Sequence, residues 1–201
     1  MLMDKNHLTS SEQMLRQIKQ RKFFLAARPW MRLSVVFILL AVLILGIALL
    51  PYVRIYGTAM EPTLSDGDLG LAFPAKEYRA GDIIAFRQGG KVLTRRIIAC
   101  PGSCVRMDEN GIVTVDGVAL IEPYLTQKAL GQCNIQFPFT VPDGHYFVLG
   151  DNRTDAVDSR STTLGCISKD VIIGRLAFIF WPFSRFQWNP SEAYILNGGT
   201  L

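Results

Sequence analysis

The sequence predicts a mainly β protein, in which an antiparallel β-sheet or barrel domain follows one N-terminal transmembrane helix. Residues 33–50 are uninterrupted by charge, and about 20 apolar residues are enough to cross a bilayer as a helix. The following residues contain short runs rich in β-branched and aromatic side chains, with turn signals between them. Short strands at this spacing are typical of antiparallel sheets and barrels.

The apolar stretch is too long for a cleavable leader. The apolar core of a leader runs for about 7 to 15 residues and ends at a small-residue cleavage site. Here no Ala-x-Ala follows, and Pro51, Tyr52 and Val53 extend the stretch toward a membrane interface. We therefore expect a retained transmembrane helix over residues 33–53.

The positive charge of the chain is concentrated before this helix. Residues 1–32 hold seven basic and two acidic side chains, whereas the rest holds 14 basic and 15 acidic ones. By the positive-inside rule, the N-terminus is cytoplasmic and the main domain lies outside the plasma membrane. A basic tail beside a lipid bilayer accounts for the net charge, and the outer domain has no basic stripe, so we expect no nucleic-acid partner.

Four regions follow from these patterns. We expect a cytoplasmic basic tail (1–32), a transmembrane helix (33–53), an extracytoplasmic β domain (54–188) and a C-terminal tail (189–201). The clearest candidate strands of the β domain are residues 81–86, 92–99, 111–115 and 145–149. Glycine, proline and Asp/Asn turn signals separate them, and no helix-period stretch of useful length interrupts them.

Four cysteines follow the apolar stretch, namely Cys100, Cys104, Cys133 and Cys166. Disulfides can form on that side if the compartment is oxidising. Three complete pairings are possible and the spacing does not choose among them, although Cys100 and Cys104 flank a Pro-Gly turn and are the easiest to bring together. Paired Cys-x-x-Cys clusters are missing and His145 is the only histidine after residue 50, so we expect no metal and no other cofactor.

The run at residues 57–64, Gly-Thr-Ala-Met-Glu-Pro-Thr-Leu, resembles the Ser-Met-x-Pro-Thr-Leu box of bacterial type I signal peptidases. The resemblance implies a Ser/Lys protease fold and activity, in which a deprotonated lysine takes the proton of the attacking serine. Ala59 stands at the serine position, and its methyl group cannot attack a peptide bond. Gly57 lies in the segment from which the family draws its oxyanion donors.

Residues 94–102 resemble the second family box, a Lys-Arg pair followed by an apolar run and a Pro-Gly turn. Arg95 occupies the position of the general-base lysine, and Arg96 matches the arginine. A guanidinium group, with a pKa above about 12, stays protonated in proteins. Arg95 therefore cannot act as the base.

Residues 150–160 resemble the third family box, Gly-Asp-Asn-Arg-x-x-Ser-x-Asp-Ser-Arg. The charged and amide residues that match it are Asp151, Asn152, Arg153, Asp158 and Arg160. In the family, the first serine of the box is understood to orient the lysine, and this chain has Ala156 there. We expect Asp158 and Arg160 to form an ion pair with each other or with Arg95 or Arg96, in a structural role.

Residues 81–86 match a further box, so the resemblance extends over about residues 33–187. On these boxes the chain is identified as a member of the type I signal peptidase family. Losses at Ala59, Arg95 and Ala156 favour a naturally noncatalytic member over a laboratory knockout, because an engineer has little reason to alter position 156. Engineering on a background that already had Ala156 stays open.

Neighbouring residues are poor substitutes for the lost groups. The side chain of Thr58 points to the opposite face from Ala59 on an extended segment. Lys91 lies about 13 Å along a strand from Arg95, at about 3.3 Å per residue. His145 is expected in the turn before the strand at Tyr146. A substitute catalytic set would need a nucleophile and a base within hydrogen-bond reach.

We therefore expect a membrane-anchored, catalytically inactive homologue that binds signal peptides or surface-protein precursors in secretion or pilus-type assembly. Binding at a strand edge uses main-chain hydrogen bonds and needs neither the serine nor the lysine. The alternative is a type I signal peptidase that cleaves signal peptides, inactivated by engineering or using an unrecognised catalytic set.

A third interpretation is a scaffold in a membrane complex without a peptide groove. Its partner would contact four aromatic side chains near the C-terminus, Trp181, Phe183, Phe186 and Trp188. We favour instead that these side chains enter the lipid interface, where aromatic residues are enriched.

Overall fold

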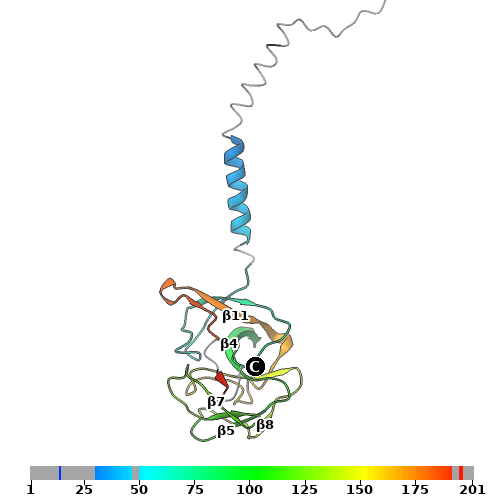
Figure 1. Ribbon diagram of the computed structural model, residues 1–201, viewed down its shortest axis with the longest axis vertical. Helices are drawn as coiled ribbons and strands as arrows, with labels where there is room; N and C mark the ends of the chain where they lie inside the picture. Colours follow the sequence, from blue (N-terminus) through cyan, green and yellow to red (C-terminus); the bar gives the residue numbers. More distant parts are fainter. Residues whose placement is uncertain (1–13, 15–29, 47–49, 192–194, 197–201) are drawn as a thin grey trace, which may run out of the picture. The chain divides into compact units, whose positions relative to one another are not determined.

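The computed structural model describes residue 14 and residues 30–46, 50–191 and 195–196. The chain divides into two compact units, Met1–Leu50 and Pro51–Leu201. In the first unit an α-helix covers residues 30–46 (Figure 1). Its side chains are exposed. Within the described residues, no helix has both the length and the apolar character that a membrane crossing requires. Residues 47–49 of the expected segment lie outside the described residues.

In the described part of the second unit, the regular secondary structure is almost entirely β-strand. Its elements are β1 (Tyr52–Arg54), β2 (Leu69–Phe73), β3 (Ile83–Gln88), β4 (Lys91–Ala99), β5 (Cys104–Met107), β6 (Val113–Val115), β7 (Val118–Ile121), β8 (Phe139–Thr140), β9 (His145–Leu149), β10 (Ile167–Ser168), η1 (Lys169–Val171), β11 (Ile172–Trp181), η2 (Phe183–Arg185), β12 (Gln187–Trp188) and β13 (Ile195–Leu196).

These strands form two sheets. The larger has the order β1-β2-β11-β3-β4-β9-β10, with β12 paired to β11, and the smaller has the order β13-β7-β6-β5-β8. The pairings between their strands are antiparallel. Figure 1 shows β4 and β11 in one lobe of this unit and β5, β7 and β8 in the other. The prediction of a mainly β, antiparallel architecture is thus confirmed.

Each of the four runs chosen as candidate strands contains a strand. The runs at 81–86 and 92–99 correspond to the hairpin of β3 and β4, and the run at 111–115 contains β6. The run at 145–149 coincides with β9. Their β-branched and aromatic residues between turn signals were a sufficient signal, although most positions of β3, β4 and β9 are buried in succession rather than alternately.

Both ends of the β domain differ from the expected boundaries. We expected Tyr52 and Val53 to extend the transmembrane segment, but both belong to β1 and pair with β2. The Val53 side chain is 5% exposed and lies in the hydrophobic core of the β domain. The expected tail 189–201 contains β13, which pairs with β7. In the same tail, the Ser191 hydroxyl accepts a hydrogen bond from the Ile83 backbone at 3.1 Å.

The longest strand, β11, was not among the candidate runs. It pairs with β2, β3 and β12, and its register against β2 and β3 shifts at three points. Leu176 and Ile179 point into the core and are at most 1% exposed. A Cβ atom added at Gly174 would lie 2.5 Å from the carbonyl carbon of Phe73. Glycine at this position therefore permits β2 and β11 to approach.

β4 supplies side chains to separate parts of the hydrophobic core. Ile97 packs with Ile84, Phe86 and other residues on one face, whereas Ile98 packs with Phe147 and residues of the smaller sheet. Both isoleucines are fully buried. Because β4 is held on two faces, its residues just before Ile97 have well-defined positions.

All four cysteines are free thiols, so the proposed Cys100–Cys104 pair is not formed. The Cys100 sulfur contacts the Tyr78 carbonyl at 3.7 Å within one apolar cluster. Cys104 instead begins β5, where its backbone N–H donates to Asp116 at 2.7 Å. Burial raises the pKa of the Cys100 thiol, and raises that of Cys166 to about 11, so both thiols are protonated at neutral pH.

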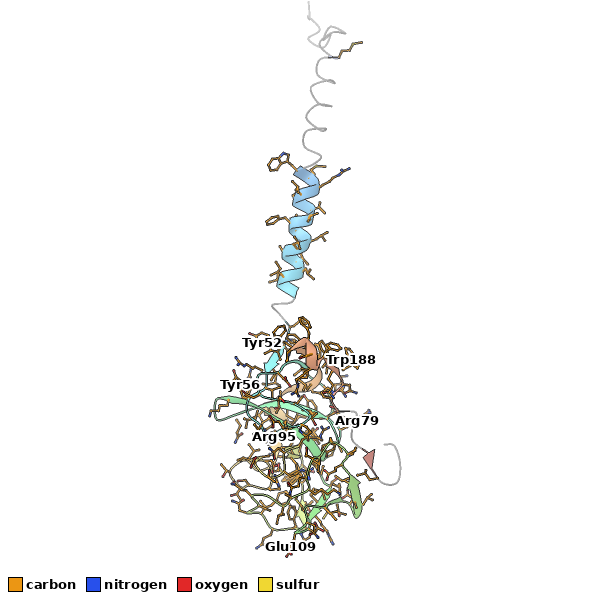
Figure 2. The ribbon with its side chains drawn as sticks, turned by 90° about the vertical axis from the view of Figure 1, so that its left-hand side faces the viewer. Tyr52, Tyr56, Arg79, Arg95, Glu109 and Trp188 are labelled. Carbon is orange, nitrogen blue, oxygen red and sulfur yellow. The ribbon has the colours of Figure 1, made fainter. Side chains whose placement is uncertain are left out.

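Exposed aromatic side chains gather around β11 and β12. Trp181, Phe183, Phe186 and Trp188 are 48%, 77%, 59% and 68% exposed, respectively. The Trp188 ring stacks on Phe178 with a centroid distance of 5.3 Å, which helps to hold β12 against β11. Tyr52 and Trp188 lie toward one end of the β domain, and Glu109 lies at the other (Figure 2).

We predict that Gly174→Ala lowers the free energy of unfolding of the β domain by about 1 to 3 kcal/mol, the usual cost of overpacking. The added methyl group would collide with the Phe73 backbone, which is fixed in β2 and cannot rotate away. Urea denaturation followed by intrinsic fluorescence measures the change. Arg175→Ala, at an exposed position of the same strand, is the control and should cost less than about 1 kcal/mol. Equal losses would contradict the packing argument.

Candidate functional site

The turn at residues 57–64 presents position 59 at the surface of the β domain. Gly57 has a φ of 77°, which glycine adopts without strain, and its N–H donates to the Asp66 side chain at 2.7 Å. Met60 is buried, and its carbonyl accepts a hydrogen bond from the Leu64 N–H at 2.9 Å. Ala59, just before this buried anchor, is half-buried.

Positions 59 and 156 meet around Gly150. A Cβ atom added at Gly150 would lie 2.5 Å from the Ala59 carbonyl oxygen and would also collide with the Ala156 Cβ. The Asn152 N–H donates to the same Ala59 carbonyl at 3.1 Å, and Ala156 is 2% exposed. The structure therefore brings together two of the three positions at which the catalytic side chains were expected.

Arg95 lies beside them, on β4. Its Nε and one terminal nitrogen donate to the Val157 carbonyl at 3.0 and 2.8 Å, and its other terminal nitrogen donates to the Thr94 carbonyl at 2.6 Å. Because Val157 directly follows Ala156, the guanidinium is fixed next to position 156. Burial lowers the pKa of Arg95, with Asp158 partly opposing the shift, but arginine remains protonated in proteins.

Arg96, the next residue, points to the opposite face and forms a buried ion pair with Asp151. Its Nε and a terminal nitrogen donate to the two carboxylate oxygens at 2.9 and 2.7 Å, and its other terminal nitrogen donates to the Gly81 carbonyl at 3.1 Å. Burial lowers the pKa of Arg96, but the hydrogen bond and charge of Asp151 outweigh it and the net shift is upward. Thr63 donates to the same carboxylate at 2.6 Å, so the 57–64 turn is tied to β4.

Arg153 forms a second buried ion pair, with Glu122. Its Nε also donates to the Gly150 carbonyl at 3.1 Å. Tyr124 donates to Glu122 at 2.8 Å and lies under the Arg96 guanidinium, whose carbon is 4.0 Å from the ring centre. Burial raises the pKa of Tyr124, so the phenol stays protonated and keeps donating.

Asp158 and Arg160 form the third buried ion pair. Pairing with each other was one of the alternatives expected from the sequence. The two side chains are joined at 2.8 and 2.7 Å, and Asp158 accepts the Gly150 N–H at 3.0 Å. Arg160 also donates to the carbonyls of Leu130 and Arg153 at 2.6 and 2.9 Å. These bonds hold the loop at residues 150–160 in one conformation.

Sequence reasoning missed the residues that complete these pairs. Glu122 and Tyr124 lie outside the boxes and are joined to them only by the fold, and a lone glutamate before a proline carries no pattern that would single it out. Thr63 lies within the first box, but the sequence does not show that its hydroxyl reaches Asp151. Among the described residues, no buried side-chain nitrogen or oxygen lacks a hydrogen-bond partner. The network is therefore internally satisfied, as stable buried polar groups must be.

The residues considered as substitutes are placed elsewhere. Lys91 is exposed at the start of β4, opposite Gln88. His145 starts β9, and its Nδ1 lies 2.9 Å from the Asp143 carbonyl. Thr58 is exposed, and its carbonyl accepts from the Asn152 side chain at 3.3 Å.

β4 has a partly free edge next to the site. β3 pairs with β4 along Lys91–Arg96, whereas β9 pairs with the other edge only from Arg96 onward. In the described part of the chain, no strand pairs with that second edge between Lys91 and Arg95. Val92, on this segment, packs against the cluster that contains Ile55 and Met60. The edge therefore lies over an apolar floor.

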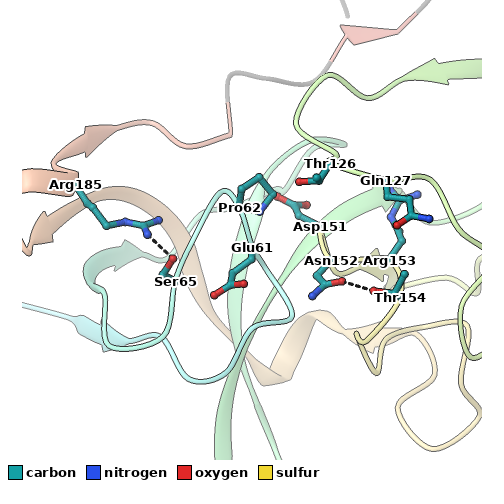
Figure 3. A pocket seen from close by; sticks show the side chains of 10 residues that line it. All are labelled: Glu61, Pro62, Ser65, Thr126, Gln127, Asp151, Asn152, Arg153, Thr154 and Arg185. Carbon is teal, nitrogen blue, oxygen red and sulfur yellow. Dashed lines mark hydrogen bonds between the residues drawn. The ribbon is translucent and has the colours of Figure 1, made fainter.

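A polar pocket of about 540 Å³ lies on the other side of the 57–64 turn. Figure 3 shows its lining, which consists of Glu61, Pro62, Ser65, Thr126, Gln127, Asp151, Asn152, Arg153, Thr154 and Arg185. Arg185 donates to Ser65, and Thr154 donates to Asn152 at 2.7 Å. Positions 59, 95 and 156 do not line it, so this pocket is separate from the place where the three positions meet.

Comparisons with known proteins agree on one family. The family described as "Signal peptidase, peptidase S26" matches residues 27–181. Signal peptidase I of Bacillus licheniformis is 33% identical over 171 residues, which cover 79% of this chain and 90% of that protein. Signal peptidase I T of Bacillus subtilis is also 33% identical, with 79% and 87% covered. A solved signal peptidase I from Enterococcus faecalis V583 has 32% identity and a TM-score of 0.43, over 50% of this chain and 97% of that one.

We predict that Asp158→Asn lowers the free energy of unfolding by about 3 to 5 kcal/mol, because it leaves the buried Arg160 guanidinium without its counter-charge. Chemical denaturation of the detergent-solubilised chain measures the loss. Arg175→Gln provides the matched control, since it breaks an ion pair of 3.5 Å whose arginine is 50% exposed. That change should cost at most about 1 kcal/mol. A small loss for Asp158→Asn would mean that this pair does not hold the loop.

Proposed function

We infer the function from one premise: this chain belongs to the signal peptidase family, peptidase S26. We propose that it is a membrane-anchored, noncatalytic member that binds extended peptides, such as signal peptides or surface-protein precursors, in secretion or pilus-type assembly. In this proposal Ala59, Arg95 and Ala156 stand at the nucleophile, general-base and base-orienting positions, and the chain has lost all three groups.

The fixed guanidinium of Arg95 is the observation that carries this proposal. Peptide-bond hydrolysis by this type of site needs a hydroxyl nucleophile and a base that can take its proton. The methyl groups of Ala59 and Ala156 offer neither a hydroxyl nor an orienting hydrogen bond. Arg95 stays charged and already donates to the Val157 and Thr94 carbonyls. No proton acceptor remains at the position of the base.

The free edge of β4 supports the binding half of the proposal. An extended peptide can add to such an edge through main-chain hydrogen bonds, while pockets between side chains choose its sequence. The Lys91–Arg95 edge has an apolar floor, to which Val92 contributes. Neither the edge nor the floor depends on a catalytic serine or lysine.

The relatives named signal peptidase I support a second candidate. On this alternative the chain is a type I signal peptidase that cleaves signal peptides from preproteins. Its catalytic set would then be unrecognised, or positions 59 and 95 would have been changed from an active parent. Lys91 and His145 are the residues considered as another base: Lys91 is exposed at the start of β4, and the His145 ring contacts the Asp143 carbonyl.

We also propose that the apolar stretch at residues 33–50 anchors the chain in the plasma membrane, with the N-terminus cytoplasmic and the β domain outside. The exposed Trp181, Phe183, Phe186 and Trp188 would then enter the lipid interface. Aromatic side chains with one apolar and one polar end are enriched there. The basic tail at residues 1–32 would remain beside anionic headgroups.

We predict that the unmodified chain does not cleave a fluorogenic signal-peptide substrate in detergent. The triple revertant Ala59→Ser, Arg95→Lys, Ala156→Ser should cleave it at a rate at least about 1,000-fold above background. It restores together the serine nucleophile, the lysine base and the hydroxyl that orients the lysine. Each single revertant should stay near background, since a lone serine has no base and a lone lysine has no nucleophile to activate.

The matched control for that experiment is Arg95→Lys with Ala156→Ser on the Ala59 background. It restores the base and its partner without the nucleophile, so it should be silent. Cleavage by the unmodified chain would refute the noncatalytic proposal and require a search for another catalytic set. Silence of the folded triple revertant would show that the site differs from that of an active peptidase in more than three side chains.

We predict that lipids brominated near the headgroup quench Trp181 and Trp188 in a chain carrying Trp30→Phe, reconstituted in vesicles. Quenching by at least about a third is expected if both rings enter the interface. Lipids brominated deep in the acyl chains should quench less. If neither lipid quenches the fluorescence, the rings do not enter the bilayer. Burial of the two rings by a bound partner protein would then support the scaffold interpretation of this surface.

A further inference from the structure

Arg95 differs from the other buried arginines of the site in having no carboxylate partner. Arg96, Arg153 and Arg160 each form an ion pair with a buried acidic side chain. In the described part of the chain, Arg95 is 6% exposed and hydrogen-bonds only to neutral backbone carbonyls. Arg95 therefore has no carboxylate of its own: Asp158 acts on it only through its charge and is hydrogen-bonded to Arg160, and burial still lowers the pKa of Arg95.

The guanidinium of Arg95 retains donor capacity. Arginine has five N–H donors, and three are used, two on the Val157 carbonyl and one on the Thr94 carbonyl. Each terminal nitrogen thus keeps one N–H, and N–H donors of a guanidinium are the usual partners of a carboxylate. Arg95 itself is 6% exposed, and the side chain of the neighbouring Val157 is 45% exposed.

The free edge of β4 ends at the same residue. An added strand can follow β4 from Lys91 to Arg95, but from Arg96 onward β9 occupies the edge, with Leu149 opposite Arg96. A peptide bound along this edge must therefore end or turn away at Arg95. Ala59, Gly150 and Ala156 lie together at this end of the edge. They offer backbone groups and methyl groups there, but no charged side chain.

We infer that Arg95 forms a binding site for the C-terminal carboxylate of an extended peptide on the β4 edge. The Arg95 cation attracts a terminal carboxylate and repels a terminal ammonium group, so it also selects the direction of the peptide: the peptide runs parallel to β4, with its last residue at Arg95. The inference rests on the proposed peptide groove. It specifies the ligand class as peptides whose C-terminus lies at Arg95, rather than precursors whose chain continues past Arg95.

The test compares two forms of one probe on the full-length chain in detergent micelles. A short fluorescein-labelled peptide that alternates valine with alanine is made with a free C-terminal carboxylate and with a C-terminal amide. Fluorescence anisotropy should show that the carboxylate form binds at least about 10-fold more tightly, the gain expected from a hydrogen bond to a charged group. This comparison needs no substitution and does not depend on the folding of a variant.

Two variants then assign the preference to Arg95. Arg95→Met should remove the difference between the two peptides, whereas Arg87→Met, at an exposed position of β3, should keep it. Thermal melting verifies that both variants are folded. Equal binding of the two peptides by the unmodified chain, or an undiminished preference in Arg95→Met, would overturn the carboxylate site while leaving the groove. If neither peptide binds, the groove itself is refuted, and the site with it.

Discussion

The ion pair between Arg96 and Asp151 is the contact on which the geometry of the site depends. It joins β4 to the loop after β9, and the same two side chains reach the Thr63 hydroxyl and the Gly81 carbonyl. Four separate segments of the chain therefore converge on one buried charge pair. Such a pair adds little net stability compared with apolar packing, but it is costly to break and so permits only one arrangement of the segments that share it.

The same network holds the loop at residues 150–160 without any serine hydroxyl or lysine amine at positions 59, 95 and 156. Asp158 pairs with Arg160, Asp151 with Arg96 and Arg153 with Glu122. Asp158 and Arg153 also bond the Gly150 backbone, and none of these contacts uses a serine hydroxyl or a lysine amine. Arg95 completes the arrangement by tying β4 to the Val157 carbonyl. The catalytic positions can therefore change while the loop that surrounds them keeps its shape.

Much of the fold was predictable from local patterns, and the failures have physical causes. β9 could be recognised because its aromatic and β-branched residues directly follow a Pro-Asp-Gly turn signal, whereas β11 was overlooked, and its pairing with two neighbours through register shifts depends on the fold. Val53 was assigned to the membrane segment since hydropathy alone does not distinguish a lipid-facing side chain from one in a protein core. Glu122, the partner of Arg153, could not be found because their pairing spans distant parts of the sequence.

The sequence by itself determined the identity of the groups at the decisive positions: a methyl group at 59, a methyl group at 156 and a guanidinium at 95. These identities decide which proton transfers are chemically possible wherever the side chains lie. Only the tertiary structure decided that positions 59 and 156 meet at Gly150, that Asp158 pairs with Arg160 and that Arg95 has no carboxylate of its own. The physical reason is that Coulomb and hydrogen-bond energies depend on distance and burial, which are set by the packing of strands remote in sequence.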